Sequence, residues 1–263
     1  MRYSRVSFGT LTVNAFEMIK GVPEKEIRSR YRVSAEGDMQ IGMNGLVVKT
    51  GNRTIVVDPG CAGFLPAALQ ESYGIRMEAS PGEMVRRAGY EPDAVTDVLF
   101  THLHFDHGSG AFLRVRGGIE KVFPNARYVV HKPHLEYAMN PLQTEEGSFF
   151  NRMLRYAGSL TYLEDWKADG VTFVESSGHT RHMISLFFRE AGESLAFPSD
   201  LMPMELFADL SAYSGYDIHP GRICKERKKF LAFLEPDTAV VLCHEPPGEL
   251  MRPWISIRCK SVH

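Results

Sequence analysis

The chain has 263 residues, of which 44% are hydrophobic, enough to bury a sizeable core in one domain over residues 1–263. A formal net charge of −2 gives no reason to expect nucleic acid or another polyanion as a partner. No apolar run approaches the ~20 residues that span a bilayer, and the N-terminus lacks the apolar stretch of a signal peptide. We therefore expect a cytoplasmic protein without a membrane partner. Its cysteines, none in CxxC spacing, are read as reduced thiols: Cys61, Cys224, Cys243 and Cys259.

Strands and helices are predicted to alternate along the chain. Val6–Phe16 alternates well enough for a strand, and Gly45–Lys49 with Arg53–Asp58 predicts a hairpin. Ser80 and Glu83 suit a capping box at the start of a short helix. Further strands are predicted at Val95–Phe100, Val171–Val174, Ser194–Phe197 and Thr238–Cys243, and an amphipathic helix at Arg222–Leu234. This interleaving indicates an α/β architecture.

Two segments fit this plan less well. Ile19–Met39 is rich in charged residues, and Asn140–Trp166 is rich in aromatic residues. Each suits a surface helix that turns its apolar face to the core. Active-site covers are also often irregular and rich in aromatics, so a lid over a pocket is the alternative.

Residues 101–107 carry the clearest chemical signal. Four metal-capable side chains lie within six positions: His102, His104, Asp106 and His107. His102 and His104 are two residues apart, so in an extended turn both imidazoles can reach one ion. Asp106 and His107 come just after and can reach a second ion. A structural zinc site takes four ligands and often cysteine, whereas this motif has no cysteine and too many ligands for one tetrahedral ion. The motif therefore predicts two ions with open positions.

Three further candidate ligands each come just after a predicted strand: His179, Asp200 and His244. Any one of them alone would be read as a polar residue at a strand end. Together they are informative, because α/β proteins place ligands at the sheet edge where strand ends gather. We therefore expect all seven side chains to form one metal centre.

The order of these motifs resembles the metallo-β-lactamase superfamily. The resemblance rests on HLHFDH at 102–107, followed by GH at 178–179 and then by Asp200 and His244. It also includes VDPG at 57–60 and FPNARY at 123–128. The resemblance implies an αββα four-layer sandwich, in which two β-sheets are faced by helices and the metals lie at one edge.

The resemblance also implies a role for each residue of the centre. The first ion would be held by three histidines: His102, His104 and His179. The second ion would be held by Asp106, His107 and His244. Asp200 would bridge both ions, and Asp58 would support the metal loop without binding an ion.

Within the superfamily, the sequence looks closest to the N-acyl homoserine lactone lactonases and methyl parathion hydrolase. It shares with them Phe105, the 123–128 segment and a long N-terminal stretch. It differs at Pro203, where many of those lactonases have a tyrosine. Asp200 argues against the true β-lactamases, which lack the bridging aspartate. His104 argues against flavodiiron oxygen reductases, which have an acidic residue at that position.

Three alternatives stay open. A glyoxalase II-like thioesterase would usually continue GHT with Pro-Gly-His, where Arg181 and His182 stand here. A mononuclear iron persulfide dioxygenase would bind one ion in the same fold. A binding protein that has lost catalysis would usually have lost a ligand, and all seven are present.

The expected activity is hydrolysis of a small-molecule ester or lactone, with phosphotriesters as a further candidate, by a hydroxide that bridges the ions. Two divalent ions bring four positive charges, and Asp106, Asp200 and that hydroxide together bring three negative ones. About one positive charge is therefore left to stabilise an oxyanion. Asp106 is the catalytic candidate, because it can carry a proton to the leaving group. The histidine and carboxylate ligands favour zinc. Iron, manganese, cobalt and nickel are the alternatives that also accept such ligands. The sequence does not decide between a monomer and a homodimer.

The other histidines, and the cysteine beside His244, receive structural interpretations. His131 and His134 flank a proline and are expected at the surface. Two others are weaker candidates for the pocket wall: His182 and His219. Cys243 should point to the face of its strand opposite His244 and so belong to the core.

Overall fold

The computed structural model describes residues 1–247, so Cys259 lies outside the described residues. The larger sheet has the spatial order β1 (Arg2–Asn14), β2 (Asp38–Thr50), β3 (Arg53–Val57), β4 (Asp97–Leu99), β7 (Arg127–Val130) and β8 (Leu160–Tyr162). The smaller sheet has the order β12 (Ala239–Val240), β11 (Glu193–Phe197), β10 (Met183–Glu190) and β9 (Val171–Ser176). A separate hairpin is formed by β5 (Phe112–Val115) and β6 (Gly118–Lys121).

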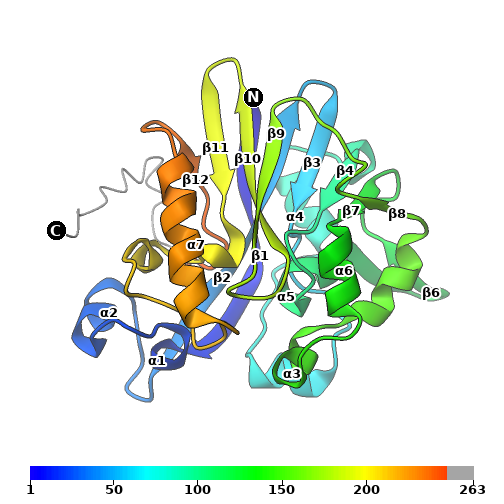
Figure 1. Ribbon diagram of the computed structural model, residues 1–263. Helices are drawn as coiled ribbons and strands as arrows, with labels where there is room; N and C mark the ends of the chain where they lie inside the picture. Colours follow the sequence, from blue (N-terminus) through cyan, green and yellow to red (C-terminus); the bar gives the residue numbers. More distant parts are fainter. Residues whose placement is uncertain (248–263) are drawn as a thin grey trace.

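The helices lie around this pair of sheets (Figure 1). They are α1 (Ala15–Met18), α2 (Glu24–Arg30), α3 (Ala67–Ser72), α4 (Pro81–Arg87), α5 (Phe105–Gly108), α6 (Lys132–Ala138) and α7 (Pro220–Phe233). Short 3-10 helices occur at Pro92–Ala94, Ser109–Ala111, Gln143–Ser148, Asn151–Ala157, Ser199–Leu201 and Glu205–Ala208. Within residues 1–247, no helix combines the length and the apolar composition needed to span a bilayer.

Side-chain alternation along the strands builds three apolar layers. Leu186 of β10 and Val57 of β3 belong to the layer between the two sheets. Phe187, the next residue of β10, faces the other way and packs against Phe230 of α7, with ring centroids 5.1 Å apart. Val56 of β3 belongs to the layer beneath α4 and α6. Helix, sheet, sheet and helix therefore lie in that order, and the predicted αββα sandwich is confirmed.

Most predicted elements are present. The hairpin is confirmed, with Thr50 paired to Arg53 across the turn. The predicted helix after Ser80 is α4, and the Ser80 side chain accepts a hydrogen bond from the Glu83 N–H at 3.3 Å. The first strand ends at Asn14 rather than two residues later, because the Asn14 side chain caps α1. The predicted amphipathic helix is α7.

The two segments that fitted poorly differ in character. Ile19–Met39 contains α2, which buries Ile27 against the core, as the surface-helix interpretation expects. Asn140–Trp166 contains two 3-10 helices and β8 instead of an α-helix. Its Met153 and Leu154 are buried beneath the larger sheet. The second segment therefore belongs partly to the core.

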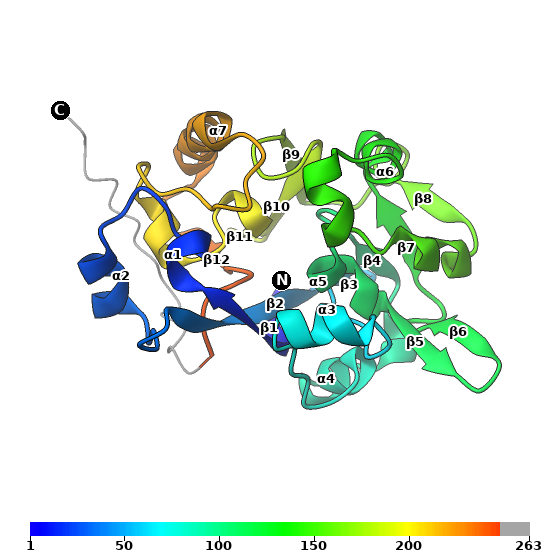
Figure 2. The same cartoon turned by 90° about the horizontal axis from the view of Figure 1, so that it is seen from below.

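The segments that follow β4, β9, β11 and β12 come together at one edge of the sandwich. β3 and β4 run parallel, as do β11 and β12. The helix α5 lies at this edge, toward the lower part of Figure 1, and Figure 2 shows the molecule from that side. The candidate ligands come from these segments.

Candidate metal centre

All seven predicted ligands lie at this edge, and their donor atoms form overlapping sets. One set, with every donor atom within 4.8 Å of the others, is His102, His104, His179 and Asp200. Another set is Asp106, His107 and His244. The carboxylate of Asp200 connects the two, because its Oδ2 lies 3.0 Å from His179 Nε2 and its Oδ1 lies 3.2 Å from His244 Nε2.

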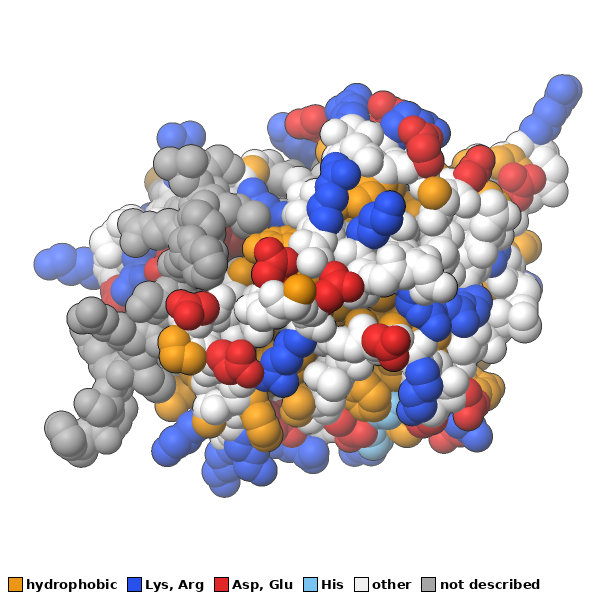
Figure 3. Space-filling model, turned by 90° about the horizontal axis from the view of Figure 1, so that it is seen from above, with side chains coloured by type: hydrophobic (Ala, Val, Ile, Leu, Met, Phe, Trp, Pro, Cys, Tyr) orange, Lys and Arg blue, Asp and Glu red, His pale blue; other side chains and the backbone are white. Residues whose placement is uncertain are grey.

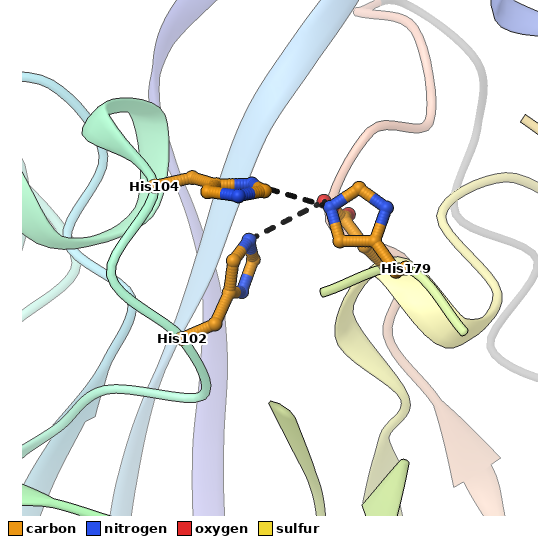
Figure 4. A group of neighbouring side chains, drawn as sticks. His102, His104 and His179 are labelled. Carbon is orange, nitrogen blue, oxygen red and sulfur yellow. Dashed lines mark hydrogen bonds and ion pairs between the residues drawn. The ribbon is translucent and has the colours of Figure 1, made fainter. Parts of the chain in front are cut away.

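The histidines of the first set turn their nitrogens toward one another (Figure 4). His104 Nδ1 lies 3.2 Å from His179 Nε2, and His102 Nε2 lies 3.6 Å from the Asp200 carboxylate. In the second set, the Nε2 atoms of His107 and His244 are 3.3 Å apart. Four of the five histidines thus present Nε2 to the centre, and His104 alone presents Nδ1.

The donor set suits divalent cations. His102 Nε2 is fully buried and has no hydrogen-bond partner among the described residues. Two imidazole nitrogens that face each other at 3.2–3.3 Å repel unless a proton or a cation lies near both lone pairs. Imidazole and carboxylate donors are the ligands that zinc and other first-row divalent ions take in proteins.

Each histidine is held by a partner on the nitrogen that faces away from the centre. His107 Nδ1 is 3.0 Å from Asp58 Oδ2, and His179 Nδ1 is 3.0 Å from Asp217 Oδ1. His244 Nδ1 donates to the carbonyl of Gly42 at 2.8 Å. Such outer partners fix the ring orientation and the tautomer of metal-binding histidines. Asp217 was not singled out from the sequence, because nothing local distinguishes a loop aspartate.

A hydrogen-bond network that includes Asp58 connects the ends of strands from the two sheets. The Asp58 carboxylate accepts hydrogen bonds from the backbone N–H of Thr101, at 2.8 Å, and from the Thr101 hydroxyl. The Thr101 hydroxyl lies 2.8 Å from Ser199 Oγ, directly before Asp200. Both Asp58 and Ser199 have positive φ, 45° and 54°, a backbone conformation that persists only where surrounding contacts enforce it. This network fixes Asp200 relative to the histidine motif.

The electrostatics of the centre favour bound positive charge. Burial alone would raise the pKa of Asp200, but His107, His244 and His179 hold it well below its usual range. Burial opposes protonation of His179, but the carboxylates of Asp200 and Asp217 raise its pKa to about 10. Burial, and then its histidine neighbours, hold the pKa of His102 well below the usual value. The carboxylates therefore attract cations to the imidazoles that face them.

A cavity of about 370 Å³ opens onto the centre. Asp106, Asp200 and His244 form part of its floor. The apolar part of the lining comes from β1, β2, α1, α5 and nearby loops: Leu11, Val13, Met18, Ile41, Tyr73, Phe105, Pro203, Tyr216 and Ile218. The lining also includes Thr144, Glu145 and Ser148 of the segment Asn140–Trp166. That segment therefore forms a wall of the cavity, whereas no residue of Ile19–Met39 lines it.

The prediction for Cys243 is confirmed in part: the residue is buried in the core, but it does not point away from the centre. Its Sγ lies 3.0 Å from Asp200 Oδ1, so the thiol contacts the centre. The predicted strand ends early, since β12 covers only Ala239–Val240, and the two-residue alternation no longer applies at Cys243. Cys243, Asp200 and His244 form a further set of mutually close donor atoms. The described cysteines Cys61, Cys224 and Cys243 are free thiols.

The predicted surface positions of His131 and His134 are wrong, because both are buried. His134 Nε2 accepts from the N–H of Leu103 at 2.9 Å, and its Nδ1 donates to the carbonyl of Arg181 at 2.6 Å. His134 thereby joins the histidine motif to the segment after His179. Neither of the two weaker pocket candidates lines the cavity: His182 and His219.

Comparisons with known proteins agree with this fold. The family model described as "Metallo-beta-lactamase superfamily" matches residues 42–244. No curated protein matches the sequence. Among solved structures, a probable metal-dependent hydrolase from Staphylococcus aureus has a TM-score of 0.84 at 18% identity, covering 93% of this chain and 89% of that chain.

Two further structures are similar over nearly the whole chain. The hydrolase AbOPH in the beta lactamase superfamily has a TM-score of 0.72 at 22% identity, covering 93% of this chain and 87% of that one. AidC, a dizinc quorum-quenching lactonase in complex with the product N-hexanoyl-L-homoserine, has a TM-score of 0.71 at 20% identity, covering 94% and 88%. At these identities the likeness concerns the fold.

Proposed function

The chain belongs to the metallo-beta-lactamase superfamily and is a hydrolytic enzyme, and on that premise we propose that it uses two divalent ions to hydrolyse a small neutral ester or lactone. The observation that carries the proposal is the pair of neighbouring donor sets that the Asp200 carboxylate connects. His102, His104 and His179 would hold the first ion. Asp106, His107 and His244 would hold the second ion, and zinc suits these donors well.

The residues around the ions have distinct tasks in this proposal. When bound, the two ions would lower the pKa of coordinated water to ~7 and polarise the bond under attack. Asp200 lies between the donor sets, where its carboxylate would neutralise part of the charge of both ions. Asp58 holds the outer nitrogen of His107. Asp106 faces the cavity, where its carboxylate can take up a proton and deliver it to the leaving oxygen.

The cavity walls suggest the class of substrate. An apolar wall beside a cationic centre suits a neutral molecule with a hydrophobic tail, whose carbonyl meets the centre while the tail meets Leu11, Val13 and Ile41. Pro203 lines the cavity without a hydroxyl, but Tyr73 and Tyr216 line it as well. Burial raises the pKa of Tyr73, so its phenol stays protonated and can donate a hydrogen bond to a substrate oxygen.

The net charge of the chain gives no support for nucleic acid as a substrate, because it is −2. Lysine and arginine side chains are also interspersed with acidic ones on the upper face of the molecule, which Figure 3 shows. A protein that binds nucleic acid needs a basic track to neutralise successive phosphates. The likeness to AidC, with its homoserine product, and to a hydrolase of the superfamily supports small-molecule lactones and esters as candidates.

The experiment is a substrate panel under identical metal loading. It compares acyl lactones, aryl esters, phosphotriesters, glutathione thioesters, β-lactams and RNA by kcat/KM. We expect the highest values for lactones or aryl esters with apolar tails, with weaker phosphotriester turnover. Faster turnover of RNA, a β-lactam or a glutathione thioester than of every lactone and ester would reject the proposal.

A further inference from the structure

His104 differs from the other histidines of the centre in the nitrogen that it presents. Its Nδ1 lies 3.2 Å from His179 Nε2 and faces the donor set, so its Nε2 points outward. A neutral imidazole that offers the lone pair of Nδ1 must carry its proton on Nε2. Something in the protein must therefore favour the Nε2–H tautomer at His104.

The outward nitrogen of His104 meets a buried carboxylate. Oε1 of Glu145 lies 3.3 Å from His104 Nε2, and Glu145 is only 4% exposed. The other carboxylate oxygen, Oε2, accepts a hydrogen bond from the hydroxyl of Tyr137 in α6. Because both oxygens already accept from protein donors, Glu145 is better suited to hold His104 than to bind substrate.

The chain around Glu145 closes over the same imidazole. The backbone of Phe149 forms a bridge with that of His104, and the Phe149 ring packs edge-on to the imidazole with centroids 4.7 Å apart. Tyr137 also packs edge-on to Phe149, with ring centroids 6.3 Å apart. Thr144 and Ser148, on either side of Glu145 in the chain, line the cavity. This turn therefore contacts both a candidate ligand and the space for substrate.

We propose that Glu145 is a positioning residue that fixes His104 in the Nε2–H tautomer and so turns Nδ1 toward the first ion position. The inference rests on the proposed metal centre and adds to it a carboxylate from the irregular segment Asn140–Trp166. Glu145 serves His104 as Asp217 serves His179. Loss of such an outer partner typically costs about 10–100-fold in metal affinity or activity.

The test uses three variants of the full chain. Glu145→Ala removes the acceptor, whereas Glu145→Gln keeps an oxygen that can still accept from Nε2–H. Glu146→Ala is the matched control, because Glu146 is the exposed neighbour in the same 3-10 helix. Zinc affinity is measured by competition with a chromophoric chelator, and imidazole tautomers are read from long-range ¹H–¹⁵N spectra, with His104 assigned from a His104→Gln spectrum.

We expect Glu145→Ala to weaken zinc binding at one of two positions by about 10–100-fold. The His104 signal should lose its Nε2–H pattern in that variant. Glu145→Gln should restore most of both properties, and Glu146→Ala should match the wild type. Unchanged zinc affinity and an unchanged His104 tautomer in Glu145→Ala would overturn the inference.

The two proposals fail separately. The tautomer of His104 can be measured with or without zinc. A wild-type chain that bound no zinc would therefore contradict the proposed function, and the His104 tautomer would still test the role of Glu145. Conversely, a wild-type chain that bound two ions, with Glu145→Ala equal to Glu146→Ala in both readouts, would contradict the role of Glu145 alone.

Discussion

The thiol of Cys243 donates a hydrogen bond to Asp200, with Sγ 3.0 Å from Oδ1. Burial raises the pKa of the Cys243 thiol well above its usual value, and the charge of Asp200 adds to this. The thiol therefore keeps its proton and acts as a donor. This hydrogen bond holds Oδ1 of Asp200, while Oδ2 of the same carboxylate lies near His179.

Removal of this donor should disturb Asp200. We expect Cys243→Ala to lower kcat/KM by about 10–100-fold, as loss of an outer partner of a metal ligand typically does. Cys243→Ser should lose less, because its hydroxyl can still donate to Asp200. Cys224→Ser, on α7, is the matched control. Equal rates for Cys243→Ala and Cys224→Ser would show that the thiol only fills space.

Asp200 itself is expected to be indispensable. Asp200→Ala removes the group that connects both donor sets, so both zinc content and turnover should fall to near background. Asp169→Ala, at an exposed aspartate, provides the control. Elemental analysis after dialysis, together with turnover, measures the effect. A variant that kept near-normal zinc and rate would disprove the bridging role.

His134 should make stability depend on pH. Burial lowers its pKa to about 3, below the ~6.5 of an unfolded histidine, so the folded chain keeps it neutral. Its contribution to stability is therefore fully present above pH ~6.5 and is lost as the pH falls from there toward 3. Through this one group, the equilibrium constant for folding should fall by up to about tenfold per pH unit within that window.

Urea unfolding with a chelator present measures this effect between pH 8 and pH 5. His134→Gln can still accept from the Leu103 N–H but does not titrate. We expect His134→Gln to be less stable than the wild type at pH 8, because the bond to the Arg181 carbonyl is lost. Its stability should fall less steeply below pH ~6.5. Parallel pH curves for the two proteins would contradict the prediction.

The apolar wall should set the preference for substrate tails. Ile218 lines the cavity and is half-buried, so Ile218→Ser should weaken selection for long apolar tails by about tenfold. The change should appear in KM more than in kcat. Ile119→Ser, at another half-buried isoleucine in the distant β5–β6 hairpin, is the control. A tail preference that stayed the same in Ile218→Ser would mean that the tail binds elsewhere.

The sequence predicted the seven candidate ligands because their signals are local. His102, His104, Asp106 and His107 adjoin in one motif, and each of the other candidates follows a strand. The αββα fold came from the resemblance carried by these motifs. The strand β10 was missed because it is apolar on both faces, so the alternation that marks a half-buried strand is absent.

The outer partners could not be read from the sequence. Glu145 lies 41 positions from His104, and Asp217 lies 38 positions from His179, in segments without a motif of their own. His134 was expected at the surface because it flanks a proline, and its contacts with Leu103 and Arg181, which lie far from it in the sequence, form only in the folded chain. These side chains act through tertiary contacts, which a single sequence does not encode locally.

The proposed centre holds two metal ions, and counting the ions in a crystal tests this most directly. A zinc-replete crystal, measured by anomalous scattering at the zinc edge and checked by elemental analysis, should show about two ions per chain, ~3.5–4 Å apart. One ion should lie among His102, His104 and His179, with Asp200 between it and the other. A single ion per chain under these conditions would contradict the account.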